Sequence, residues 1–207
     1  MSRGDTESLK LDIRKLTLFN QMAKAGANTV ADHLNQMTGM ETEMEITKIN
    51  FLDIEDIKTH VGHDKQVGTH IELVEPPHGY ILFLFSAQSA KKLATGMLPE
   101  SGDVSSKGFS DMERSAVQEI GNIMTSGFID GWANVLNTTI DISTPKFTYG
   151  AGSKMVENLV GTRRDEMALV FDSRVHARAA DVEVKVYTFP ELSELVELMQ
   201  QIEMTNV

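Results

Sequence analysis

A stripe of polar side chains on one predicted helix is the first candidate for chemistry in this sequence. At about 100° of rotation per residue, four of them fall within roughly 60° of one another: Ser115, Glu119, Asn122 and Ser126. The apolar residues of the segment lie on the opposite side: Val117, Ile120, Met124, Phe128 and Val135. A carboxylate and a carboxamide on one exposed face offer hydrogen-bond acceptors and donors to a reactant. A helix packed on a sheet always has a solvated polar face, however, so the spacing alone does not establish a site.

Other catalytic chemistries have little support in the sequence. The 207 residues include no cysteine, which excludes disulfides, thiolate nucleophiles and zinc–thiolate sites. The segment His60-Val61-Gly62-His63-Asp64 and His70 have metal-binding residue types. Ligands spaced three and four residues apart require a helix, which Gly62 disfavours, so we interpret the segment as a polar loop. No Gly-rich phosphate loop, nucleophile elbow or zinc-protease motif is present.

The charge balance and the lack of long apolar segments narrow the class of protein. Lys and Arg number 19 against 30 Asp and Glu, and the net charge of -11 would repel the phosphate backbone of nucleic acid. The longest apolar run, residues 80–85, is far shorter than the roughly 20 residues of a membrane helix. Residues 1–8 are polar and carry no signal-peptide core. The sequence therefore predicts an acidic cytoplasmic protein that neither binds nucleic acid nor inserts into a membrane.

Two long helices are the clearest predicted elements. Apolar residues recur at spacings of three and four from residue 9 to residue 38, which is the period of an amphipathic helix, and Gly39 ends it. The second helix, which carries the polar stripe, is expected over residues 111–136. Ser110 and Glu113 have the Ser-x-x-Glu spacing of a capping box, in which each side chain accepts a hydrogen bond from a backbone N–H group at the helix start.

Shorter segments follow each long helix in the same order. After the first come a strand, a hairpin around Pro76-Pro77 and a short helix, expected at residues 41–52, 67–74, 79–85 and 86–98. After the second come a strand, a hairpin and a last helix, expected at residues 138–149, 167–171, 182–189 and from Pro190 onward. Pro145 lacks the N–H group that a central strand needs, so it favours an edge or strand-end position. Residues 151–153 and 161–164 are interpreted as surface loops.

The repeated order indicates an internal duplication. The two long helices align at an offset of 98 residues, which pairs Met22 with Ile120 and Val30 with Phe128. Sequential strands joined by hairpins favour a largely antiparallel sheet with the helices packed on it. We therefore expect an α+β fold with pseudo-two-fold symmetry, as one domain over residues 1–207 with repeats at about 9–98 and 110–203. Residues 1–8 are expected to be flexible and residues 99–103 to link the repeats.

The polar stripe belongs to a longer motif. Ser115, Glu119 and Asn122 follow the pattern Ser-x-x-x-Glu-x-x-Asn, and 22 residues separate Asn122 from Pro145. With the core Gln118-Glu119-Ile120-Gly121-Asn122-Ile123, this pattern resembles the signature of the CheC/CheX/FliY family of chemotaxis phosphatases. The resemblance covers nearly the whole chain, since that family is also an internal duplication with a long helix opening each half. It implies a CheC-like fold and a function in chemotaxis signalling.

The resemblance implies a phosphatase that hydrolyses the aspartyl phosphate of a CheY-type response regulator. Carried over by position, Asn122 would place its carboxamide against the attacking water, and Glu119 would contact a lysine of the regulator. Phosphoryl transfer depends more on positioning and charge stabilisation than on a strong base, and a neutral amide does not repel the phosphoryl group. Ser115 is expected to hold the Glu119 rotamer and Pro145 to stiffen the neighbouring strand. Magnesium would belong to the regulator, so no metal or cofactor of the chain's own is expected.

The first half departs from the motif. At the 98-residue offset, the equivalents of the four motif residues are Thr17, Gln21, Lys24 and Thr47. A lysine only donates hydrogen bonds and cannot replace a carboxamide that orients water. An alignment shifted by one residue places Leu16, Asn20 and Ala23 there instead. Either alignment predicts an inactive first half and one intact site in the second.

Two other functions compete with the phosphatase. The first is a catalytically weak adaptor of the chemotaxis or motility machinery, for example a partner of a CheD-type receptor deamidase, with which family members associate. The second is a structural switch-complex domain related to the FliM middle domain, which lacks the Glu/Asn pair. A pure scaffold has no chemical reason to keep both Glu119 and Asn122, so their presence favours the phosphatase.

Overall fold

The computed structural model describes residues 13–39, 41–97, 108–161, 167–177 and 180–205. Within these residues, the first half contains α1 (Ile13–Thr38), β1 (Thr42–Asp53), α2 (Ile54–Val61), β2 (Lys65–Leu73), β3 (Gly79–Ser86) and α3 (Ala87–Met97). The second half repeats this order with α4 (Asp111–Leu136), β4 (Lys146–Ala151), α5 (Gly152–Val160), β5 (Met167–Ala177), β6 (Ala180–Pro190) and α6 (Leu192–Thr205). The predicted α+β duplication is therefore confirmed. The proposed linker and the N-terminal segment lie outside the described residues.

The strands form one antiparallel sheet in the order β1-β5-β6-β3-β2-β4. Exchanging each strand for its counterpart in the other half reverses this order, so the sheet has an internal pseudo-two-fold relation. The two halves interlock, because β1 pairs with β5 of the second half and β4 pairs with β2 of the first. The outermost strands are β1 and β4, which confirms the edge position expected beside Pro145.

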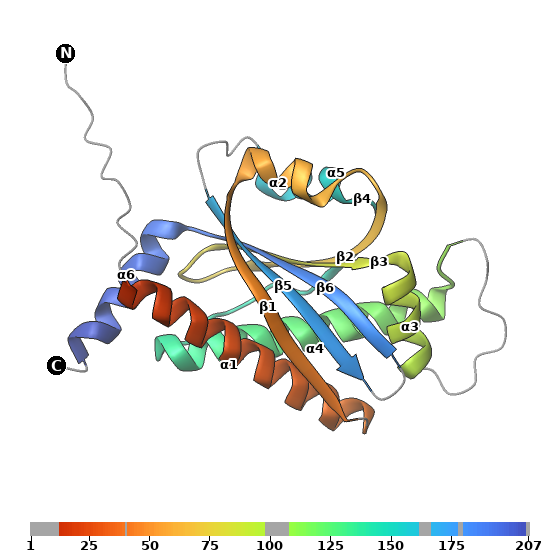
Figure 1. The fold of residues 1–207 in the computed structure, drawn as a ribbon, viewed down its shortest axis with the longest axis horizontal. Coiled ribbons are helices and arrows are strands. Elements are labelled where there is room, and N and C mark those ends of the chain that lie inside the picture. Colours follow the sequence, from red (N-terminus) through yellow and green to blue (C-terminus); the bar gives the residue numbers. More distant parts are fainter. Residues whose placement is uncertain (1–12, 40, 98–107, 162–166, 178–179, 206–207) are drawn as a thin grey trace, which may run out of the picture.

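Helices cover both faces of the sheet (Figure 1). The long helices α1 and α4 pack against each other on one face, whereas the short helices α2 and α5 lie together on the other. Successive strand residues pack against opposite helix layers: Phe83 and Phe171 face the long helices, and Leu84 and Val170 face the short ones. No helix in the described part of the chain is long and apolar enough to cross a membrane.

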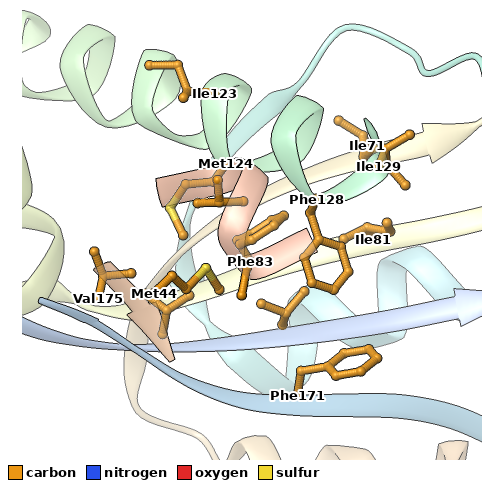
Figure 2. Packing of buried hydrophobic residues seen from close by; sticks show 14 of the residues in the cluster. Met44, Ile71, Ile81, Phe83, Ile123, Met124, Phe128, Ile129, Phe171 and Val175 are labelled. Carbon is orange, nitrogen blue, oxygen red and sulfur yellow. The ribbon is translucent and has the colours of Figure 1, made fainter. Parts of the chain in front are cut away.

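The core beneath α4 is built on aromatic contacts. The Phe128 ring points from α4 toward the sheet (Figure 2) and meets the rings of Phe83 and Phe171 edge-on, at centroid distances of 6.0 and 5.5 Å. Trp132 is fully buried one turn further along and anchors the helix. A Cβ atom on Gly131 would lie 2.3 Å from the backbone nitrogen of Gly26, so α1 and α4 approach closely only because these positions lack side chains.

The capping box at the start of α4 is confirmed. The Glu113 N–H group donates to Ser110 Oγ at 3.2 Å, and the Ser110 N–H group donates to Glu113 Oε2 at 2.7 Å. At the end of α1, Gly39 has φ of 65°, and its N–H group donates to the Asn35 carbonyl at 2.9 Å. Both long helices thus begin or end where local side-chain or backbone chemistry predicts.

Several predicted boundaries are wrong. Residues 151–153 are not a surface loop: Ala151 ends β4, and Gly152 and Ser153 are buried at the start of α5. A larger residue would not fit at position 152, because α2 packs there and a Cβ atom on Gly152 would lie 2.3 Å from Val61 Cγ1. In the other predicted loop, Gly161 forms the C-cap of α5, and residues 162–164 lie outside the described residues.

The strands of the second half also differ in extent from the prediction. The regular strand β4 begins only at Lys146, and before it a single bridge joins Ile142 to Leu73. The hairpin strands β5 and β6 are longer than predicted, because charged residues on their outer face interrupt the apolar pattern without interrupting the ladder. Asp172 lies opposite Lys185, and Arg174 lies opposite Glu183.

Candidate functional site

The polar stripe predicted on the second long helix lies on the surface of α4. Ser115 and Glu119 are exposed and Asn122 is half-buried, whereas Ile120 and Met124 on the opposite side of the helix are buried in the core. Within the described part of the chain, the side chains of Ser115, Glu119 and Asn122 have no hydrogen-bond or ion-pair partner. The carboxylate and the carboxamide are therefore presented to solvent rather than used in the fold.

Pro145, the fourth motif residue, is buried directly before β4. It is joined to α4 through Gln118, whose Nε2 atom donates a hydrogen bond to the Pro145 carbonyl at 3.4 Å. Gln118 precedes Glu119, so the edge strand and the site helix are connected beside the polar stripe. This contact places the backbone of Pro145 next to the site helix.

Gly121 sets how closely α4 approaches the sheet at the site. A Cβ atom on Gly121 would lie 2.4 Å from Cγ2, 2.5 Å from Oγ1 and 2.7 Å from Cβ of Thr69, which is fully buried in β2. The helix backbone therefore rests on the Thr69 side chain between Glu119 and Asn122. Gly121 belongs to the motif, but its packing role could not be predicted from the sequence, because the sheet topology brings Thr69 to it.

The first-half equivalents occupy the corresponding surface of α1. Both long helices have 26 residues, and their bounds differ by the 98-residue offset. Gln21 and Lys24 are exposed like Glu119, whereas the shifted alignment would place Ala23, which is 1% exposed, at the position of Asn122. The burial pattern thus supports the 98-residue alignment.

Thr47 corresponds to Pro145, and the strand is irregular at both positions. In β1 the pairing with β5 shifts between Ile46 and Lys48, and the Thr47 hydroxyl donates to the Asp172 carbonyl at 3.0 Å. In the second half, Pro145 stands where β4 begins. A proline and a bulged threonine therefore break the ladder at equivalent positions.

A groove of about 320 Å³ lies between α1 and β1 in the first half. Its walls are largely apolar, with two lysines; the lining residues are Phe19, Asn20, Ala23, Lys24, Ile46, Thr47, Lys48, Ile49 and Phe51. The lining contains no carboxylate, so this surface lacks the Glu/Asn combination of α4. The expectation of an inactive first half agrees with this lining but is not tested by it.

The histidine segment forms no metal site in the described residues, where no cluster of three or more His, Asp, Glu or Cys side chains could hold an ion. His60 lies on α2, so the polar-loop interpretation was wrong for it, and Gly62 ends that helix at φ of 78°. Partial burial is the main cause that lowers the pKa of His60, and the positive charge of the nearby Lys185 lowers it further. His63 instead contacts the Ser153 hydroxyl at 3.0 Å.

A larger groove of about 660 Å³ lies on the face of the sheet away from the long helices. Both cationic and anionic side chains line it, and Arg174 pairs with Glu183 at 3.7 Å. Lys185 in turn lies opposite Asp172. None of the four motif residues lines this groove, so we do not place the functional site here.

Solved structures with this arrangement come from flagellar and chemotaxis proteins. FliY of Thermotoga maritima superposes with a TM-score of 0.73 at 16% identity, over 89% of this chain and 94% of that one. The FliM middle domain of H. pylori superposes with a TM-score of 0.67 at 10% identity, over 92% and 99% of the two chains. At these identities the likeness shows a shared fold: two interlocked repeats with paired long helices on one antiparallel sheet.

Sequence comparison goes further than the fold. A protein of Halobacterium salinarum named "Putative CheY-P phosphatase CheC1" is 48% identical over 197 residues, which are 94% of this chain and 100% of that protein. The model of the CheC-like family matches residues 112–149, the segment that contains all four motif residues. The chain belongs to the CheC-like family of chemotaxis proteins.

Proposed function

We propose that this protein hydrolyses the aspartyl phosphate of a CheY-type response regulator at a single site on α4. The observation that carries the proposal is the presence of Glu119 and Asn122 on one solvent-facing stripe, without partners among the described residues, in the segment that matches the family. The name of the 48% identical relative supports the same activity.

The chemistry asked of Asn122 suits a carboxamide. Hydrolysis of an aspartyl phosphate needs a water molecule held in line with the bond that breaks. The Asn122 side chain can accept a hydrogen bond from that water through its carbonyl oxygen and can donate another through its amide group. Since it is neutral, it does not repel the phosphoryl group as a carboxylate would. Magnesium is expected to come with the regulator, and this chain supplies the water-orienting group.

Glu119 is proposed to bind the regulator rather than to orient the attacking water. It lies one turn before Asn122 and is exposed, so its carboxylate can reach a lysine that the regulator presents beside its phosphorylation site. Ser115 lies one further turn back on the same exposed stripe. Its side chain makes no hydrogen bond to Glu119 within the described part of the chain, so its role in holding the Glu119 rotamer stays a prediction. Pro145 is proposed to stiffen the entry to β4, where its carbonyl receives the Gln118 hydrogen bond.

The decisive experiment follows phosphate loss from a phosphorylated CheY-type regulator. We expect the protein to accelerate this loss and Asn122→Ala to lower kcat by about 100-fold, because the carboxamide acts in the transition state. Asn28→Ala, which removes an exposed asparagine from α1, is the matched control and should keep full activity. An Asn122→Ala protein as active as its parent would contradict the proposal.

A catalytically weak adaptor is the second candidate. The loss of the Glu/Asn pair from α1 and the fold shared with FliM favour it. The same assay separates the two functions, because an adaptor would bind the regulator without accelerating phosphate loss. Binding of a CheD-type deamidase remains a prediction from the resemblance and needs its own binding measurement.

A further inference from the structure

An exposed methionine lies on the same stripe of α4 as the proposed site. Met112, in the first turn of the helix, is 63% exposed. It precedes Glu119 by seven residues, which is about two helical turns, so the two side chains point in nearly the same direction. The core of the protein does not use this side chain. A polar residue would serve equally well at this position if only the stability of the helix mattered.

A second exposed apolar side chain flanks the start of α4. Tyr149 on the edge strand β4 is 37% exposed, and its ring meets that of Phe109 edge-on at a centroid distance of 5.2 Å. Phe109 stands directly before the Ser110 cap, so Tyr149 lies beside the N-terminal end of the site helix. In the described residues no strand pairs beyond β4.

Met112 and Tyr149 are two of the three large hydrophobic side chains that the described part of the chain exposes; the third is Val74, at 47%. Single exposed apolar residues are ordinary on protein surfaces. Two that flank one end of a proposed catalytic helix are more informative, because exposed apolar groups near a polar pair are typical of an interface. Val74 lies elsewhere, where its N–H group bonds the Asp141 carbonyl beyond the end of α4.

We infer that Met112 and Tyr149 form the apolar part of the surface on which the phosphorylated response regulator docks. This inference rests on the proposed function, since the polar part of the same surface is Glu119 and Asn122. The occupant that fits presents a cation toward Glu119 and apolar side chains about two turns away, toward the start of α4. A methionine suits such a contact because its unbranched, polarisable side chain adapts to the shape of a partner.

The test separates docking from hydrolysis. The regulator is activated with beryllofluoride, which mimics the phosphoryl group and is not hydrolysed, and its Kd is measured by titration. Met112→Gln keeps the length of the side chain and the helix propensity, and we expect it to raise Kd and KM about tenfold with kcat unchanged. Val74→Thr is the matched control and should change Kd by less than about twofold. Tyr149→Ser should also raise Kd, and a thermal melt checks that its fold is intact.

The outcomes distinguish the docking inference from the proposed function. If the parent protein hydrolyses the phosphorylated regulator but Met112→Gln and Tyr149→Ser bind as the parent does, the docking inference is overturned and the proposed function stands. If the parent binds the activated regulator through Met112 but does not accelerate phosphate loss, the docking surface is supported and the phosphatase is not. If the parent neither binds nor hydrolyses, both claims fail.

Discussion

Replacing Gly121 by alanine tests whether the closeness of α4 to the sheet controls the site. The added Cβ atom would lie 2.4 Å from Thr69 Cγ2 and must move about 1 Å to reach ordinary van der Waals contact. Thr69 cannot move away from the helix, because it is paired with Phe83 of β3 on one side and with Phe147 of β4 on the other. The turn that carries Glu119 and Asn122 must therefore rise from the sheet.

The effect on activity should exceed the effect on stability. Overpacking of this kind costs about 1–3 kcal/mol, and the better helix propensity of alanine returns up to about 1 kcal/mol. We expect a net loss of about 1–2 kcal/mol in the free energy of unfolding, which leaves the protein folded. A misplacement of about 1 Å in a group that orients a reactant can lower kcat by about 100-fold.

The assay compares Gly121→Ala with a control and a rescue. Gly150→Ala is the control, because a Cβ atom there meets nothing within 4 Å, and it should keep full activity. Thr69→Ala removes the two closest atoms and a buried hydroxyl that has no partner in the described residues, so the double variant should recover part of both stability and kcat. Unchanged phosphate release by Gly121→Ala would refute the argument, as would a double variant no better than the single one.

Two further predictions concern charged residues on the long helices. Glu119→Lys should raise the KM for the regulator by about tenfold or more at low salt, and the difference should shrink as salt is added; normal affinity at low salt would exclude the proposed ion pair. Lys24→Ala on α1 should leave kcat and KM within about a factor of two, as measured by phosphate release, because this exposed position carries no part of the proposed site. A large loss would show that the first half contributes to binding.

The sequence predicted the elements that have strong local signals. The capping box of Ser110 and Glu113 marks the start of α4, and its apolar period continues to Leu136, where the helix ends. The short helices α2 and α5 were missed, because eight or nine residues with a few apolar positions follow a strand directly and show no separate pattern. A buried glycine and serine at the start of α5 also have the composition of a loop.

In the candidate site, too, some features could be predicted from the sequence and others depend on the tertiary structure. Glu119 and Asn122 could be named from the sequence, because their types and spacing are part of one helix and one motif. The contact between Gly121 and Thr69 could not, since it joins residues that only the sheet topology brings together. The exposure of Met112 also depends on tertiary packing, because a methionine among polar residues is equally typical of a buried helix start.

The interlocked order of the strands has a consequence for how this chain folds. Thr42 pairs with Ala177 and Asp53 with Met167, so β1 lacks its neighbour until more than a hundred further residues have been synthesised. Contacts of such long sequence separation are slow to form, because chain entropy is lost before they contribute. On the ribosome, the edge of β1 that pairs with β5 therefore stays unpaired until β5 emerges, and the nascent chain is exposed to aggregation through this strand edge during that period.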